Sequence, residues 1–316
     1  MTLILGTIEQ GLIFAIMALG VYITYHILDF PDLTVDGSFP LGGALTAALL
    51  SAGISPFATL PLSFLAGAAA GALTGIIHVK LKVQNLVAGI IVMTGLYTIN
   101  LRIAGKANVP LFSVDTIFSG SGVAGLLPNA LAPYSALIII AIMAGIVKLL
   151  LDLYMGTKSG YLLRAVGDNE QLVTTLAKDR GSVKILGLTI ANGLVALSGS
   201  IMVQWQGVFD ITIGTGTVVI ALASVIIGIS LARVVPHLGA SSAVCIGSVL
   251  YRSAVAIAIA YGLSATDLKL VTAVLLLVIL VATTQRRKRV KARSLGDTTG
   301  RDTVVAAPES GVSADA

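Results

Sequence analysis

Long apolar runs separated by short polar clusters dominate the chain. Most of the runs approach or exceed the ~20 residues that an α-helix needs to cross a bilayer. The pattern therefore predicts an all-α membrane protein with about nine transmembrane helices, eight at the least and ten at the most. The predicted spans are 10–28, 38–54, 57–77, 84–103, 130–151, 183–204, 217–232, 236–261 and 268–284.

Two of the predicted spans are short for a hydrocarbon core about 30 Å thick. The 38–54 run is also rich in glycine, and 217–232 is among the shortest of the set. Both features are typical of broken or re-entrant helices, so we expect breaks near these two segments.

The composition fits a protein surrounded by lipid. Apolar residues make up 56% of the chain and charged residues only 11%, whereas a soluble domain carries about 25% charged residues. The 34 glycines suit close helix packing in lipid. The single cysteine, Cys245, lies in an apolar run, where we expect it to pack as a small apolar residue. The first run has no basic residues before it, so we interpret it as a retained span rather than a signal peptide.

Basic residues predict the orientation of the spans. If the N-terminus lies outside and nine spans follow, sixteen of the 20 basic residues fall on the inner side. This places the 152–182 loop and the C-terminus in the cytoplasm, so the prediction is a multi-pass protein of the cytoplasmic (inner) membrane. The 29–37 loop carries three aspartates and no basic residue. If 38–54 does not cross, the N-terminus moves inside and the rest is unchanged.

The predicted spans define one membrane domain, residues 1–284, followed by a tail. The halves of the domain are about 1–151 and 183–284, joined by the 152–182 loop. The tail, 285–316, begins with a run of basic residues and continues with Ala, Ser, Thr, Gly and Asp. We expect the basic run to bind anionic membrane lipid and the rest to be disordered. Nothing else in the chain supports a nucleic-acid partner.

A short internal repeat links the two halves. Residues 30–37 and 208–216 both read Asp-aliphatic-Thr-aliphatic before a glycine, and Asp210 follows Asp32 by 178 positions. Two halves of about five spans each would have opposite orientations, as in transporters built from inverted repeats with broken helices. The polar residues of the two motifs could contact substrate or only cap helices. These candidates are Asp32, Thr34, Asp36, Asp210 and Thr212.

Three polar residues inside predicted spans are further candidates for the translocation path. Arg252 lies mid-span and could line the path or pair with an aspartate, because charged groups are expensive in a membrane. Tyr97 and Asn100 lie within the fourth span. The three histidines show no metal-ligand spacing and no nucleophile has an adjacent base, so we expect neither a metal site nor a catalytic site.

The 152–182 loop carries the pattern of a short amphipathic helix. Asp168 or Asn169 could cap it, and Leu172, Val173 and Leu176 would share one face. This apolar face must be buried, either in the lipid headgroup region or in a groove on a soluble partner. The helix pattern alone does not choose between them.

Three stretches carry a resemblance to a known family: 28–38, 97–110 and the loop from Gly160 to Gly181 with the span after it. The chain resembles permeases of ABC importers of the branched-chain amino-acid and ribose type, and more closely those of tryptophan/tyrosine-type uptake systems. The resemblance covers residues 8–284. It implies a homodimer, although two different permeases are not excluded. It also implies a cytoplasmic ABC ATPase subunit and an extracytoplasmic substrate-binding protein as partners.

The same resemblance gives the loop a role. The residues that would couple the permease to the ATPase are Arg164, Asp168, Asn169, Glu170, Leu172, Val173 and Leu176. The chain has no ATPase motif of its own, because Gly156-Thr157-Lys158-Ser159 lacks the glycine spacing of a P-loop. We therefore expect no bound cofactor, with ATP hydrolysed by the partner subunit.

The sequence thus predicts a transport subunit that moves a small polar metabolite, for which the resemblance suggests an amino acid. The alternative is an ion-coupled secondary transporter. This alternative predicts a buried carboxylate cluster within the spans, whereas the carboxylates here lie near span ends.

Overall fold

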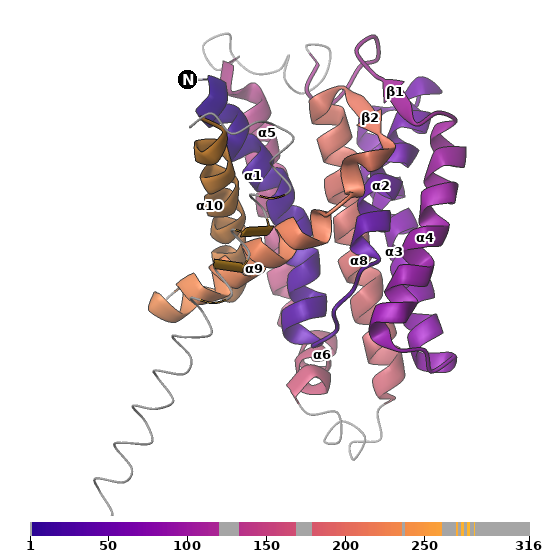
Figure 1. The fold of residues 1–316 in the computed structure, drawn as a ribbon, viewed down its shortest axis with the longest axis vertical. Coiled ribbons are helices and arrows are strands. Elements are labelled where there is room, and N and C mark those ends of the chain that lie inside the picture. The colour runs from indigo at the N-terminus through magenta and orange to yellow at the C-terminus, as the bar shows by residue number, and fades with distance from the viewer. Residues whose placement is uncertain are drawn as a thin grey trace, which may run out of the picture.

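The computed structural model describes residues 2–119, 133–168, 179–235 and 238–260, with isolated positions between 270 and 281. These residues are mostly helical and form one bundle (Figure 1). In chain order the elements are α1 (Thr2–Val21), η1 (Tyr22–Ile27), α2 (Val35–Ser51), α3 (Pro56–Lys80), α4 (Asn85–Ala104), β1 (Asn108–Pro110), α5 (Ser135–Met155), α6 (Lys158–Asp168), α8 (Arg180–Gln206), β2 (Val208–Asp210), η4 (Ile211–Gly214), α9 (Thr217–Val234) and α10 (Ala240–Ala260).

Seven helical segments of the described residues are long and apolar enough to cross a membrane. They are Ile4–Ile27, Pro56–Lys80, Asn85–Ala104, Ser135–Met155, Arg180–Gln206, Ile211–Val234 and Ala240–Ala260. The predicted count of about nine is therefore not confirmed. Predicted span 38–54 forms α2, which has 17 residues. Predicted span 268–284 lies outside the described residues except for isolated positions.

Local signals set several helix ends. Pro56 opens α3, where the missing N–H costs nothing because the first turn has no acceptor for it. Asp179 caps α8, and its carboxylate accepts hydrogen bonds from the backbone N–H groups of Gly181 and Ser182. Helices α4 and α8 each end at a glycine with positive φ, Gly105 at 74° and Gly207 at 68°.

Helix α8 lies at the centre of the bundle, in contact with α1, α2 and α3. The contact with α3 follows a stripe of glycines at four-residue spacing, Gly67, Gly71 and Gly75. A Cβ added at Gly71 would lie 2.1 Å from the carbonyl oxygen of Leu188 on α8. Small residues at this spacing let two helix backbones approach closely, which drives helix association in lipid.

Two short strands join the halves of the chain at one end of the bundle. β1 and β2 pair antiparallel, with Val109 opposite Phe209. The sequence predicted helices alone and did not indicate this strand pairing. Its cause is tertiary, because each strand has three residues and is held by its partner from a distant part of the chain.

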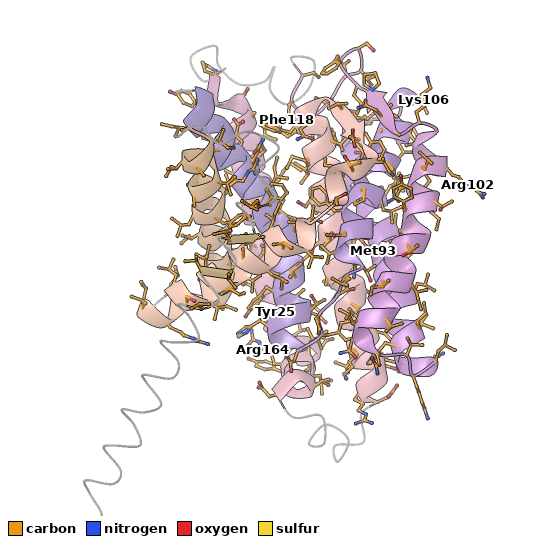
Figure 2. All side chains as sticks on the ribbon, in the orientation of Figure 1. Tyr25, Met93, Arg102, Lys106, Phe118 and Arg164 are labelled. Atoms are coloured by element: carbon orange, nitrogen blue, oxygen red, sulfur yellow. The ribbon has the colours of Figure 1, made fainter. Side chains whose placement is uncertain are left out.

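The ends of the bundle differ. We call the end with β1 and β2 the β end, and the end with α6 the α6 end; the chain starts at the β end (Figure 1). Helix α1 runs from the β end to the α6 end, and α8 runs in the opposite direction (Figure 1). Arg102 and Lys106 lie at the β end, and Arg164 lies at the α6 end (Figure 2).

The glycine stripe generates a prediction. Replacing Gly71 with Ala places a methyl group against the Leu188 carbonyl, so α3 and α8 must separate; overpacking of this kind costs about 1–3 kcal/mol. We expect the melting temperature of the purified protein to fall by several degrees.

The matched control is Gly145→Ala on α5, where an added Cβ would have no atom within 4 Å. This variant should melt at or above the wild-type temperature, because Ala favours helix over Gly. Equal melting temperatures for the two variants would contradict the close α3–α8 contact.

Candidate functional site

Two helix breaks enter the bundle from opposite ends. The first link, between η1 and α2, turns back into the bundle from the α6 end, and the second, between α8 and α9, descends from the β end (Figure 1). Each link holds the same local turn. The Asp32 carboxylate accepts a hydrogen bond from the Thr34 backbone N–H at 2.8 Å, and that of Asp210 accepts one from the Thr212 N–H at 2.7 Å. The two copies of the sequence motif therefore share one backbone hydrogen bond.

Asp36 joins the two breaks. It lies in the first turn of α2, and its carboxylate reaches the N-terminus of α9. It accepts hydrogen bonds from the backbone N–H of Gly216 at 3.1 Å and of Val218 at 2.8 Å, and from the Thr217 hydroxyl at 2.9 Å. A carboxylate at a helix N-terminus is favoured because it satisfies free N–H groups and faces the positive end of the helix dipole. One half of the chain thus caps the broken helix of the other.

The backbones of the two breaks touch beside this cap. Pro40, inside α2, has no N–H to donate to the carbonyl of Asp36. Gly214 of η4 packs there, and a Cβ added to it would lie 2.3 Å from the Asp36 carbonyl oxygen and 2.5 Å from the Pro40 ring. Asn100 supports α2 from α4, donating its side-chain N–H to the Gly37 carbonyl at 3.0 Å.

Asp32 is buried in a network of hydrogen bonds. Its carboxylate accepts a hydrogen bond from Asn192 of α8 at 2.7 Å, and Ser38 donates to the Asn192 side-chain oxygen at 2.8 Å. The Thr34 hydroxyl lies 2.8 Å from the hydroxyl of Thr74 on α3. Asp32 is 6% exposed, so in this conformation it braces the first break against α8. Its contact with substrate stays a prediction.

The other predicted path residues lie apart from the Asp36 contact. Asp210 and Thr212 are at the β end, where Asp210 also accepts from the Asn108 side chain at 3.4 Å. Hydrogen bonds from the side chain and backbone of Thr212 hold the pKa of the Asp210 carboxyl below its usual range. Tyr97 is 55% exposed on α4, and its role in the path stays a prediction.

Arg252 on α10 lies against α1. Its guanidinium donates a hydrogen bond to the Gln10 side chain and lies over the Phe14 ring, 5.4 Å from the ring centroid. Within the described part of the chain, no carboxylate lies within ion-pair distance of it, so the alternative of an ion pair with an aspartate is not observed. Glu9 of α1 is also buried, with an exposed fraction of 8%. Its carboxylate accepts a hydrogen bond from the Trp205 indole N–H at 3.0 Å.

Sequence reasoning missed Glu9 because it stands one residue before the predicted span 10–28. Helix α1 starts at Thr2 and carries Glu9 into the bundle. The sequence signal that could have identified Glu9 is a carboxylate about two turns inside an otherwise apolar helix.

Two of the predicted coupling residues, Arg164 and Asp168, lie on α6, and the others follow it in the sequence. Leu163 and Val166 are buried under α6, and a Cβ added to Gly167 would overlap the Ile27 carbonyl oxygen, so this helix is docked on the base of the bundle. Arg164 and Asp168 are exposed on it. Helix α6 covers Lys158–Asp168, and the short amphipathic helix predicted to follow it lies outside the described residues. The remaining coupling residues, Asn169, Glu170, Leu172, Val173 and Leu176, lie outside the described residues.

The chain was compared with known proteins. The family described as branched-chain amino acid transport system / permease component matches residues 3–282. The chain belongs to this family. As a permease component it is a multi-pass membrane protein and a transport subunit for small-molecule import, not a catalytic enzyme.

Relatives of the permease include several importers. The chain is 45% identical to the tyrosine transport system permease protein of Clostridioides difficile over 277 residues, covering 88% of this chain and 90% of the relative. It is 26% identical to the ribose import permease protein RbsC of Haemophilus influenzae, covering 71% of this chain and 68% of the relative. It is 25% identical to the probable branched-chain amino acid transport permease protein LivH of Methanocaldococcus jannaschii, covering 68% of this chain and 69% of the relative. No solved structure matches the chain.

The Asp36 contact generates the prediction for this subsection. In Asp36→Asn an amide N–H₂ replaces one carboxylate oxygen, so an N–H group at the α9 N-terminus loses its acceptor. An unsatisfied buried donor costs about 1–3 kcal/mol. We expect a lower melting temperature and a loss of transport.

Asp29→Asn is the matched control, because Asp29 is exposed in the same link. Its positive φ of 49° is tolerated by Asn. If both variants melted and transported like wild type, the Asp36 cap would not hold the two halves together.

Proposed function

We propose that this permease imports an amino acid across the cytoplasmic membrane, driven by a separate ABC ATPase subunit and supplied by an extracytoplasmic substrate-binding protein. Family membership supports the class of transporter, and the tyrosine transport relative supports an aromatic amino acid as the first substrate to test. The structural observation that carries the proposal is the Asp36 carboxylate, which holds the N-terminus of α9 from the first turn of α2. A transporter needs such a contact between two movable halves.

The two halves form an inverted repeat in this proposal. α1 and α8 run in opposite directions, and each is followed by a broken helix, α2 or α9 (Figure 1). The third helix of each half packs on the first helix of the other, so that α3 contacts α8 and α10 contacts α1. Exchange of partners in this way is what a two-fold axis in the membrane plane produces.

The α6 end faces the cytoplasm in this proposal. At that end Lys80 is the last residue of α3, Lys82 follows it, Arg164 lies within α6 and Arg180 starts α8. Arg102 and Lys106 lie at the β end (Figure 2). A surplus of basic residues marks the cytoplasmic side. The β end, with its paired strands, then faces the binding protein, and the C-terminal tail lies in the cytoplasm.

Motion would pass from the ATPase through α6 to the site. Leu163 of α6 packs against Gly187 of α8 and Leu28 at the start of the first link. That link leads through Asp32 to Asp36, so a shift of α6 would bear directly on the first break. Alternating access would then involve a rearrangement at the α2–α9 contact.

The test is co-purification of the tagged chain from its native membrane, with the bound proteins identified by mass spectrometry. We expect an ABC ATPase to co-purify, and to be lost when Leu172 and Leu176 are both replaced by Asp, because the two charges oppose insertion into an apolar groove. Val304 and Val305 replaced by Asp in the tail serve as the control and should keep the ATPase.

Uptake by proteoliposomes completes the test. With the ATPase and binding protein present, tyrosine uptake should require ATP. Uptake by the chain alone, driven by an ion gradient, would overturn the proposal in favour of a secondary transporter.

A further inference from the structure

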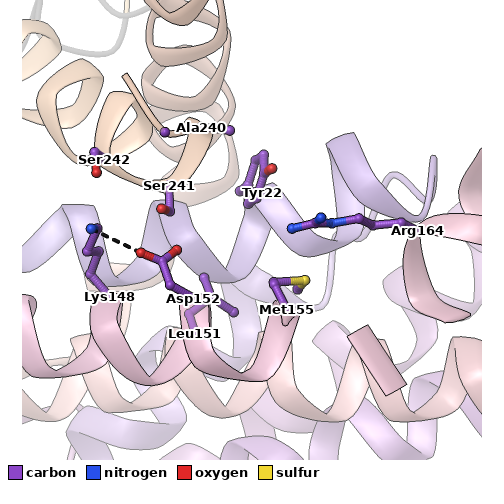
Figure 3. Close-up of a pocket in the computed structure, with 10 residues that line it drawn as sticks. Tyr22, Lys148, Leu151, Asp152, Met155, Arg164, Ala240, Ser241 and Ser242 are labelled. Carbon is purple, nitrogen blue, oxygen red and sulfur yellow. Dashed lines mark ion pairs between the residues drawn. The ribbon is translucent and has the colours of Figure 1, made fainter. Parts of the chain in front are cut away.

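A polar cavity lies at the α6 end, outside the site formed by the two breaks. It measures about 370 Å³ and is enclosed by η1, α5, α6 and the first turn of α10. Figure 3 shows its charged and hydroxyl side chains, which come from η1, α5, α6 and α10. None of them takes part in the Asp36 contact, so the role of this cavity is separate from that of the two breaks.

The cavity carries an excess of positive charge. Lys148 and Asp152 on its α5 wall form an ion pair at 3.0 Å and neutralise each other. Arg164 extends from α6 toward the same space (Figure 3). In the part of the chain that the structure describes, Arg164 has no carboxylate partner. One guanidinium charge is therefore left over.

Two residues that are mostly buried also line the cavity with hydroxyl groups. Tyr22 is 7% exposed and Ser241 is 8% exposed. Within the described residues, neither hydroxyl makes a hydrogen bond. A hydroxyl can donate or accept a hydrogen bond, so both can bind a ligand in the cavity.

The start of α10 adds further donors. Ala240, Ser241 and Ser242 form its first turn and line the cavity. Backbone N–H groups in a first turn lack acceptors within the helix, and the helix dipole is positive at that end. Together with the guanidinium and the two hydroxyls, this turn surrounds one space with several donors, while the Asp152 carboxylate on the α5 wall is paired with Lys148.

We propose that this cavity binds a phosphate group. Arg164 supplies the charge and a planar pair of N–H donors, which suits phosphate oxygens. The α10 first turn and the hydroxyls of Ser241 and Tyr22 supply the remaining donors. The phosphate can come from a phospholipid headgroup or from free inorganic phosphate, and the two sources share this chemistry.

Binding would tie α6 to α10. Arg164 is the only cavity residue on α6 among the described ones, and α6 leads directly into the predicted coupling stretch. An occupied site would hold α6 against the bundle, and an empty one would leave this helix held only by its apolar face. Phosphate occupancy would thereby control how firmly the coupling loop is anchored.

The experiment measures the melting temperature of the purified full-length chain in detergent, followed by Trp205 fluorescence. The probes are sodium phosphate against sodium chloride at equal ionic strength, and dioctanoyl phosphatidylglycerol against dioctanoyl glycerol. We expect wild type to be stabilised by at least one phosphate-bearing probe. Stabilisation by the lipid alone identifies a headgroup site, and stabilisation by inorganic phosphate identifies a site for the free anion.

Substitutions of cavity residues test whether the stabilisation by phosphate arises at this cavity. Arg164→Gln should raise the probe concentration for half-maximal stabilisation by about tenfold or more, because a charge-assisted contact is lost. Ser241→Ala should raise it by a smaller factor. Lys158→Gln removes a charge from the same helix at an exposed position outside the cavity, and should bind like wild type.

Either of two results would overturn the phosphate site. One is a wild-type melting temperature that neither probe raises above its matched control. The other is an equal response of wild type, Arg164→Gln and Ser241→Ala to both probes. Both results leave the import function itself untouched, since uptake is measured separately.

Discussion

Backbone hydrogen bonding is the constraint on which this structure depends. A broken helix inside a membrane exposes N–H groups that lipid cannot satisfy. Here the free N–H groups of α9 are satisfied by the Asp36 carboxylate of the other half. The break in one half is therefore stable only while the second half is in place. This makes the α2–α9 contact both a structural requirement and the natural point for a conformational change.

The network around Asp32 limits how that change can occur. Asp32 is bonded to Asn192 of α8, and Thr34 lies beside Thr74 of α3. Helices α3 and α8 are held together by the Gly67, Gly71 and Gly75 stripe. The first link and these two helices are thus expected to move as one body. The second link is tied to a different segment, because its strand β2 pairs with β1 and Asp210 accepts a hydrogen bond from Asn108. Relative motion is then concentrated at Asp36 and Gly214.

The sequence predicted what local patterns determine. Apolar runs located the helices, and the Asp-x-Thr motifs located both breaks, because their turn closes within three residues. Contacts between residues far apart in the chain could not be predicted from these local patterns. The bond from Asp36 to Val218 spans 182 positions, and Asn108 of β1 lies opposite Asp210 of β2, 102 positions away. Arg252 was singled out correctly as a costly charge, but its partners, Gln10 and Phe14, are not the aspartates that charge complementarity suggested.

Helix α6 connects the first helix break with the proposed phosphate cavity. Its apolar residues Leu163 and Val166 are buried, while Arg164 on the same helix reaches the polar cavity. The apolar contacts fix α6 under the first link whatever the ligand state, because they depend on packing alone. The Arg164 contact depends on an anion. Helix α6 therefore has one permanent attachment next to the helix break and one conditional attachment to α10. A conditional attachment of this kind can adjust the stiffness of the path from the coupling loop to Asp36 without changing the fold.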